Sequence, residues 1–241
     1  MARALVFPGQ GSQAVGMGKD LYDAFASARE VFQEVDDALE QKLSKLMFEG
    51  PDDDLTLTEN AQPALMAVSL AAMAVLKTEG GFELSKSAEF VAGHSLGEYS
   101  ALAAAGTFSL ADTARLLKLR GQSMQQAVPV GEGAMAALLG LDLAVAQEVV
   151  DAAAEGEVLA TANDNAAGQV VISGKTSAVE RAVEVAKEKG AKRAMLLQVS
   201  APFHCPMMAP AAEVMADALS KVDVSAPVVP LIANVTAGPV S

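Results

Sequence analysis

Gly93-His94-Ser95-Leu96-Gly97-Glu98-Tyr99 lies between a short apolar run, residues 90–92, and a helix-prone segment of small residues, 100–106. This order predicts a strand, a tight turn and a helix, with the serine at the turn. A glycine on either side of Ser95 suits a sharp turn, because a side chain there would collide with nearby backbone. Gly-x-Ser-x-Gly in this context is the pattern of a nucleophile elbow. A serine that merely caps the helix explains the same residues equally well, so the rest of the chain must decide.

Composition narrows the classes of function. The 241 residues carry 17 basic and 30 acidic side chains, a net charge of −13 at pH 7. Nucleic acid and anionic membrane surfaces are therefore not expected as partners, and an anionic substrate would need a local basic group. The single cysteine, Cys205, is typical of a reducing compartment. Residues 1–8 are too short for a signal peptide, and the longest apolar stretch, 64–76, is shorter than the roughly 20 residues that span a bilayer. We expect a cytoplasmic protein.

The order of the elements predicts a core with a small inserted domain. Residues 4–7 and 90–92 are typical of buried strands, and the elbow pattern indicates an α/β-hydrolase-like core with a parallel sheet. Between 134 and 199 the pattern is strand, helix, strand, strand, helix, strand, which is a ferredoxin-like (βαββαβ) unit with its hairpin turn at 163–168. We predict an α/β core over residues 1–130 and 200–241, with the ferredoxin-like subdomain over 131–199.

Two helix starts are predicted from capping-box patterns. Ser27 with Glu30 is expected to open a helix that runs to about residue 41, and Ser109 with Asp112 to open another. On the second of these helices, Arg120 lies at the edge of an apolar stripe. From this position alone, the guanidinium is expected to extend to water rather than to serve a site.

A reactive serine needs a base to take its proton. The chain has two histidines, of which His94 is a poor candidate because side chains next to each other in a turn point in different directions. His204, in a loop bounded by prolines over residues 202–206, is the other candidate, although a lone loop histidine is more often structural or merely exposed. A metal site is not expected, because two histidines and one cysteine offer no suitable ligand spacing.

Five short motifs follow one another along the chain in a specific order. They are Gly9-Gln10-Gly11-Ser12-Gln13, Gly93 to Tyr99, Arg120-Gly121-x-x-Met124-Gln125, Asn163 with Gly168 to Gly174, and His204-Cys205. In this order and spacing the chain resembles the malonyl-CoA:acyl carrier protein transacylases of fatty-acid synthesis over essentially its whole length. Any one motif is weak evidence, but five in register are specific. The family also implies the inserted ferredoxin-like unit.

The resemblance implies the catalytic residues. Ser95 would be acylated by malonyl-CoA and would then pass malonyl to the phosphopantetheine thiol of acyl carrier protein. His204 would act as its general base and then as general acid toward the leaving thiol. The backbone N–H groups of Gln10 and Leu96 would form the oxyanion hole.

The resemblance also implies the substrate contacts and the partners. Arg120 would hold the malonyl carboxylate in a bidentate pair. Met124, Asn163 and Phe203 would line the site, with Phe203 similar to the malonyl-selecting form of this loop. The family needs no cofactor, since the carrier protein brings the phosphopantetheine, and its members are monomers. They continue past the position of Ser241, so we expect part of the core, including the group that orients His204, to lie beyond it.

Two other functions fit parts of the sequence. A serine esterase or thioesterase with a Ser-Asp-His triad needs an acid dedicated to His204, for which Asp151 or Asp164 could serve, and has no use for Arg120. A non-catalytic module of the same fold that only docks a carrier protein would need none of these side chains to react.

Overall fold

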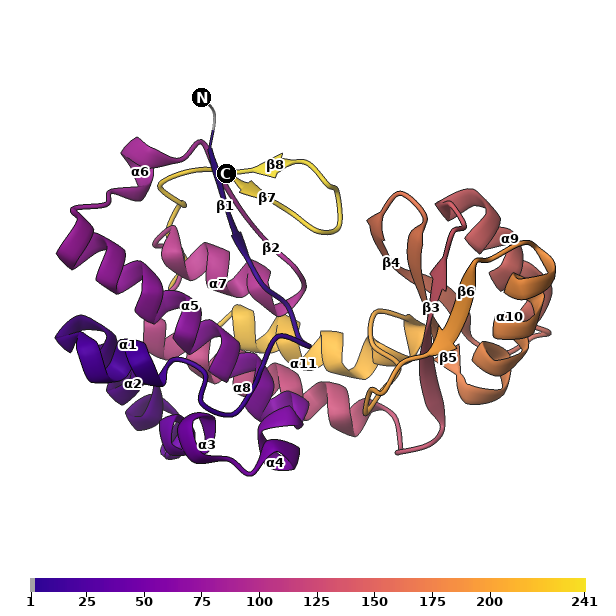
Figure 1. Ribbon diagram of the computed structural model, residues 1–241, viewed down its shortest axis with the longest axis horizontal. Coiled ribbons are helices and arrows are strands. Elements are labelled where there is room, and N and C mark those ends of the chain that lie inside the picture. The colour runs from indigo at the N-terminus through magenta and orange to yellow at the C-terminus, as the bar shows by residue number, and fades with distance from the viewer. Residues whose placement is uncertain (1–2) are drawn as a thin grey trace. The chain divides into compact units, whose positions relative to one another are not determined.

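The computed structural model describes residues 3–241; Met1 and Ala2, at the start of the predicted core segment 1–130, lie outside the described residues. The chain forms two compact units (Figure 1), the first of Met1–Gly121 with Asp217–Ser241 and the second of Gln122–Ala216. The second unit extends past the predicted subdomain at both ends. The reason is that side chains from the segments on either side of it, such as Met124 and Phe203, pack with the second sheet in one buried cluster.

The first unit contains a four-stranded sheet in the order β1-β2-β7-β8. Its strands are β1 (Ala4–Phe7), β2 (Phe90–Gly93), β7 (Leu231–Ile232) and β8 (Pro239–Val240). Strand β2 pairs in parallel with both β1 and β7, whereas β8 is antiparallel to β7. The prediction of a mixed α/β fold with a parallel sheet is therefore confirmed, and the strand predicted at residues 4–7 is present.

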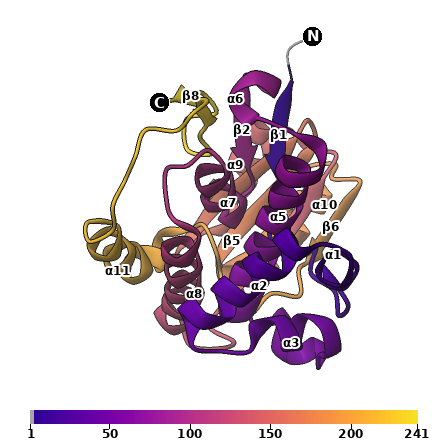
Figure 2. The same ribbon diagram turned by 90° about the vertical axis from the view of Figure 1, so that its left-hand side faces the viewer.

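Helices pack around this sheet, and the longest of them is central. The helices that begin in the first unit are α1 (Lys19–Ala24), α2 (Ala26–Leu39), α3 (Leu43–Glu49), α4 (Asp52–Thr56), α5 (Thr58–Gly80), α6 (Leu84–Ser87), α7 (Leu96–Ala104) and α8 (Leu110–Ala127). Figure 2 shows α5 between α2 and α7. Among residues 3–241, α5 is the helix whose length and composition would suffice to cross a membrane, and half of its most apolar window is buried. Its apolar faces are explained by the core that α2 and α7 share with it.

The two predicted helix starts have different outcomes. Helix α8 begins at Leu110 as predicted, because Ser109 Oγ accepts a hydrogen bond of 3.0 Å from the Asp112 N–H and donates one of 2.7 Å to its carboxylate. The prediction at Ser27 is wrong. Helix α2 begins at Ala26, and its N-cap is Phe25 in an extended conformation. Ser27 instead lies in the first turn, where its hydroxyl is 3.0 Å from that of Thr78 on α5, so packing between helices overrides the local pattern.

The second unit is built on an antiparallel sheet in the order β4-β5-β3-β6. Its elements are β3 (Gly133–Leu139), α9 (Leu143–Ala153), β4 (Leu159–Ala166), β5 (Gln169–Lys175), α10 (Thr176–Glu188), β6 (Arg193–Leu196), the 3-10 helix η1 (Pro206–Met208) and most of α11 (Ala209–Leu219). Helices α9 and α10 cover one face of the sheet. Alternate residues of β3 divide between the faces: Ala136 and Leu138 pack with the helices, and Met135 packs with Phe203 on the other side.

The hairpin turn predicted at 163–168 is shorter in the structure. Strand β4 continues to Ala166, and Asn163 and Asp164 pair with Val171 and Val170 of β5. Two register shifts in β4 absorb the extra residues, and the turn itself is reduced to Ala167 and Gly168. Pairing with the buried strand β5 therefore overrides the turn preference of the asparagines.

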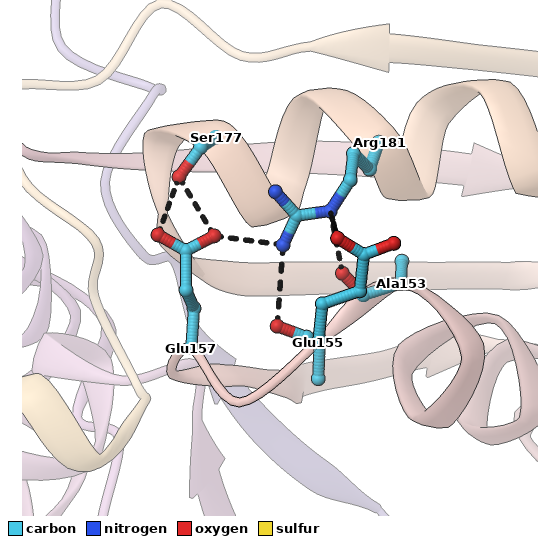
Figure 3. Close-up of polar contacts among 6 residues, drawn as sticks. Ala153, Glu155, Glu157, Ser177 and Arg181 are labelled. Atoms are coloured by element: carbon cyan, nitrogen blue, oxygen red, sulfur yellow. Dashed lines mark hydrogen bonds and ion pairs between the residues drawn. The ribbon is translucent and has the colours of Figure 1, made fainter.

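One arginine joins the end of α9 to α10 (Figure 3). Arg181 donates hydrogen bonds of 3.0 Å from Nε to Ala153 O and of 3.2 Å from Nη2 to Ala154 O, the last carbonyl groups of α9. Its Nη2 also donates to Glu157 Oε2 at 2.7 Å, and the Ser177 hydroxyl donates to the same carboxylate. These hydrogen bonds, that of Arg181 first, hold the pKa of Glu157 below its ordinary value. Arg181 thus adds a charged donor at the C-terminal end of α9, where Ala154 O also accepts a hydrogen bond of 2.8 Å from the Glu157 N–H.

Replacing Arg181 by alanine is expected to lower the free energy of unfolding by about 1–2 kcal/mol, because the two carbonyl groups lose a charged donor. Urea unfolding followed by far-ultraviolet circular dichroism measures the change. Arg115→Ala is the matched control, since its 3.2 Å ion pair with Asp112 joins two side chains on the surface of one helix and is worth under about 0.5 kcal/mol. Equal losses in the two variants would contradict the capping role.

Candidate active site

Ser95 lies at the turn between β2 and α7, so the predicted strand, turn and helix are all present. Its backbone has φ +52° and ψ −108°, a conformation that residues other than glycine rarely adopt. A Cβ added at Gly93 would collide with the backbone of Gly97, and one added at Gly97 would lie 2.5 Å from Phe7 O. The serine hydroxyl makes no capping hydrogen bond to α7, although Ser95 occupies the N-cap position. This is the geometry of a nucleophile elbow rather than of a helix cap.

A residue far along the chain holds the turn in this strained conformation. The Ser95 N–H donates a hydrogen bond of 2.7 Å to Asn234 Oδ1, and Asn234 Nδ2 donates one of 2.6 Å to Gly93 O. The backbone N–H of Asn234 donates in turn to the Glu98 carboxylate on α7 at 2.8 Å. Sequence reasoning missed Asn234, which is 139 residues from Ser95. The available signal was a polar residue directly after a buried strand that runs parallel to β2.

Replacing Asn234 by alanine is expected to slow the reaction of Ser95 with a fluorophosphonate probe about tenfold. The variant loses two side-chain hydrogen bonds, each worth about 1 kcal/mol, that offset the strain of the turn. The rate of labelling, followed by intact mass, measures this without any assumption about the natural substrate. Val235→Ala is the control, because that neighbouring side chain is 93% exposed. Labelling of the Asn234 variant at the wild-type rate would contradict the positioning role.

The glycine-rich loop after β1 lies against the elbow. Phe7 of β1 is in register with Gly93 of β2, so the two parallel strands end at the same side of the sheet. Beyond this point the His94 N–H donates to Phe7 O at 3.1 Å, and a Cβ added at Gly9 would lie 2.5 Å from His94 Nδ1. The loop that carries Gln10 is therefore brought to the turn that carries Ser95.

Two backbone N–H groups, one on the loop after β1 and one at the start of α7, are candidates for binding a negative charge beside Ser95. Within residues 3–241 the backbone N–H groups of Gln10 and Leu96 donate no hydrogen bond, whereas the N–H of Ser95 between them is engaged by Asn234. Both belong to the first unit, on the loop and the turn that lie against each other. They can therefore donate to a developing negative charge beside Ser95.

Arg120 points at the serine. Its Nη2 donates a hydrogen bond of 3.0 Å to Ser95 Oγ, its Nη1 donates one of 2.7 Å to Gln62 Oε1, and its guanidinium carbon lies 5.7 Å from the centre of the Tyr99 ring. Burial lowers the pKa of Arg120, and the neighbouring Tyr99 and Glu98 offset this in part. The expectation that this side chain extends to water is wrong, because Gln62 and Ser95 offer it hydrogen-bond acceptors inside the unit.

The other predicted site residues belong to the second unit. Met124 and Phe203 pack together in one buried cluster, and Asn163, half-buried on β4, pairs with Val171 of the same cluster. His204 has φ +59° and is exposed, in a turn between the buried residues Phe203 and Cys205. The structure thus brings together Ser95, Gln10, Leu96 and Arg120 in the first unit, and Met124, Asn163, Phe203 and His204 in the second. Proton transfer between Ser95 and His204 stays a prediction.

No group of three or more histidine, cysteine, aspartate or glutamate side chains in the described part of the chain is arranged to hold a metal ion. Two acids were considered as the third member of a triad. Asp151 accepts a hydrogen bond of 2.9 Å from Gln147 on the same helix, and Asp164 is exposed on β4.

The comparison with known families gives the class of enzyme. Residues 4–241 match the acyl transferase domain. A mixed α/β fold with a serine at a strained strand-to-helix turn is consistent with acyl transfer, since such a turn presents a hydroxyl beside free N–H groups. The protein is an acyltransferase.

Individual relatives narrow the class. The malonyl CoA-acyl carrier protein transacylase of Bacillus subtilis is 50% identical over 97% of this chain and 73% of its own length. The enzyme of the same name from Escherichia coli K12 is 48% identical over 96% of this chain and 74% of its own length. The crystal structure of the acyl-carrier-protein S-malonyltransferase of Bartonella henselae is 61% identical with a TM-score of 0.97, over 100% of this chain and 76% of that one. A malonyl-transacylase solved with a type II polyketide acyl carrier protein is 42% identical with a TM-score of 0.95, over 100% of this chain and 77% of that one.

The chain belongs to the malonyl CoA-acyl carrier protein transacylase family, as its five motifs indicated. It spans about three quarters of the length of these relatives.

Proposed function

We propose that this chain transfers malonyl from malonyl-CoA to the phosphopantetheine thiol of an acyl carrier protein, through a malonyl ester on Ser95. The observation that carries this proposal is the Arg120 guanidinium, which lies 3.0 Å from the Ser95 hydroxyl in an enzyme of this family. In a malonyl group, one methylene separates the carboxylate from the carbonyl that reacts. A guanidinium beside the nucleophile can pair with that carboxylate while the thioester reaches the serine.

The reaction consists of two acyl transfers. The first turns a thioester into an ester of Ser95, and the second turns that ester into a thioester of the carrier. Ser95 Oγ attacks the thioester carbonyl, the new C–O bond forms, and the C–S bond to coenzyme A breaks. His204 takes the hydroxyl proton and delivers it to the leaving sulfur. In the second transfer the carrier thiol attacks the malonyl ester and His204 takes its proton. The new C–S bond forms, the C–O bond to Ser95 breaks, and the proton returns to Ser95 Oγ.

The oxyanion of each tetrahedral intermediate accepts hydrogen bonds from the N–H groups of Gln10 and Leu96. Their lack of donated hydrogen bonds within residues 3–241 supports this role, as does the engagement of the Ser95 N–H by Asn234. The charge that develops there is also favoured by the N-terminal end of α7.

Selectivity follows from the charge of Arg120. A partly buried guanidinium that faces an acyl group without a carboxylate stays unpaired, which disfavours acetyl and longer acyl groups by a few kcal/mol. Met124, Asn163 and Phe203 line the acyl site, and Phe203 limits the room for a branch. Exchange between an ester and a thioester needs a nucleophile and an acid–base group, so we propose no cofactor; the phosphopantetheine belongs to the carrier.

The finer description of the fold is part of the proposal. The second unit has βαββαβ element order, the strand order β4-β5-β3-β6 and both helices on one face, which supports a ferredoxin-like subdomain near residues 131–199. Parallel β1 and β2 with the elbow between β2 and α7 support an α/β-hydrolase-like core over residues 1–130 and 200–241. We also propose a cytoplasmic monomer, consistent with the buried free thiol of Cys205.

The test is intact-mass spectrometry of the protein after incubation with malonyl-CoA, followed by peptide mapping. We expect one malonyl adduct on the peptide that contains Ser95, and its loss when a holo-acyl carrier protein is added, with malonyl appearing on the carrier. Rapid loss of the adduct to water without a carrier would indicate an esterase or thioesterase. Binding of the carrier without any adduct would indicate a docking module.

A further inference from the structure

Behind the guanidinium of Arg120 lies a chain of three side-chain hydrogen bonds, which we term the Thr58 relay. Arg120 Nη1 donates to Gln62 Oε1 at 2.7 Å, and Gln62 Nε2 donates to Thr58 Oγ1 at 2.9 Å. Thr58 Oγ1 in turn donates to Gln10 Oε1 at 2.9 Å. All four residues belong to the first unit. The relay therefore joins the proposed carboxylate-binding group to the loop that carries a proposed oxyanion donor.

The relay forms where the start of α5 meets α8. Thr58 and Gln62 are one helical turn apart on the same side of α5, and each is only 1% exposed. Helix α8 can approach closely because Gly121 follows Arg120: a Cβ added there would lie 2.7 Å from the backbone nitrogen of Glu59. Buried polar groups are costly unless they are paired, so the two buried members, Thr58 and Gln62, are held in one orientation by their hydrogen-bond partners. Gln10 is exposed and Arg120 is partly buried.

Thr58 does not cap the helix that it begins. The N-cap of α5 is Leu57, and no side chain caps its first turn. The hydroxyl is used instead for both links of the relay, as acceptor from Gln62 and as donor to Gln10. Thr58 also ties the Gln10 side chain to helix α5. Near Gln10 the other hydrogen bonds of the loop are local, such as that from Ser12 Oγ to Gly9 O, and farther along the loop the Gly16 N–H donates to Met47 O at 2.8 Å.

We propose that Thr58 is a positioning residue that couples acyl-group recognition to oxyanion stabilisation. Its hydroxyl hydrogen fixes the Gln10 side chain, and with it the loop whose N–H faces the elbow. Its oxygen fixes the Gln62 amide, which aims the guanidinium of Arg120 at the acyl site. This inference rests on the proposed function, because it gives Arg120 and Gln10 the roles assigned there.

The experiment compares wild type, Thr58→Val and Thr58→Ser in the acylation of Ser95 at saturating malonyl-CoA and at saturating acetyl-CoA. Valine has nearly the same shape as threonine but neither donates nor accepts. We expect Thr58→Val to lower the maximal rate of malonylation about tenfold, the effect of roughly one charge-linked hydrogen bond, and to lower the preference for malonyl over acetyl severalfold. Thr58→Ser, which keeps both links, is expected to stay within about threefold of wild type in both quantities.

Ala71→Gly is the control for a purely structural effect. Ala71 is fully buried on the same helix and outside the relay, and the change lowers stability through the helix backbone. If Thr58→Val keeps the wild-type rate and preference, or if Ala71→Gly of equal melting temperature shows the same losses, the coupling role is overturned. If wild type itself takes no malonyl, the proposed function is wrong. In that case the rate at which a fluorophosphonate labels Ser95, a reaction that also uses the oxyanion donors, is compared among wild type, Thr58→Val and Thr58→Ser. This comparison tests the hydrogen bond from Thr58 to Gln10.

Discussion

Ser95→Ala protein is expected to form no malonyl adduct, a loss of at least about a thousandfold in the rate of acylation. The physical reason is that the strained turn presents one hydroxyl to the acyl group, and the other groups of the site act on the transition state that this hydroxyl forms. The measurement is intact mass after incubation with malonyl-CoA, with wild type treated in parallel.

Ser100→Ala is a matched control on the same helix. The Ser100 hydroxyl is fully buried and has no hydrogen-bond partner within the described residues, so its removal is expected to leave acylation unchanged and stability equal or slightly higher. Malonylation of the Ser95→Ala protein at another residue would show that the elbow is not the site of the reaction.

Arg120→Ala is expected to lower the rate of malonylation by about a hundredfold or more and to raise the rate of acetylation relative to it. Removing the guanidinium leaves the malonyl carboxylate without its partner, and a buried charge pair broken on one side costs about 3 kcal/mol. For acetyl-CoA the same change removes an unpaired charge. Arg120→Lys is expected to resemble alanine more than wild type, because an ammonium cannot reproduce bidentate pairing or the contact with the Tyr99 ring.

Lys118→Ala provides the control for loss of a cation from α8. Lys118 pairs with Glu59 at 3.0 Å and donates to Asn60, and neither contact involves the acyl site. This variant is expected to keep the wild-type preference for malonyl over acetyl. An unchanged preference in Arg120→Ala, with ester hydrolysis intact, would instead support a serine hydrolase.

Local patterns predicted the parts of this protein that local forces decide. The elbow was found because Gly93, Ser95 and Gly97 form one short motif, in which a Cβ at Gly93 would collide with the backbone of Gly97. The need for glycine at position 97 is not local, because it comes from the backbone of Phe7. The start of α8 was found because Ser109 and Asp112 satisfy each other through two hydrogen bonds. The same pattern at Ser27 was misleading, because α2 packs against α5 and begins earlier than its sequence indicates.

The parts that were missed depend on contacts between distant segments. The orientation of Arg120 depends on Gln62, which is 58 residues away, and position on a helix wheel alone favoured solvent. Asn234 and Thr58 contact the site through side-chain hydrogen bonds to residues far away in the sequence, Ser95 and Gln10, and such bonds leave no periodic signal. Family resemblance predicted the reacting groups, but it gave no indication of Asn234 or Thr58.

The bond between Asn234 and the Ser95 backbone also has a consequence for how the enzyme is made. A ribosome completes residue 95 long before residue 234, and until strand β7 has emerged and paired with β2 the Asn234 side chain cannot accept the Ser95 N–H. The serine therefore gains its final geometry late in synthesis, when β7 joins the sheet.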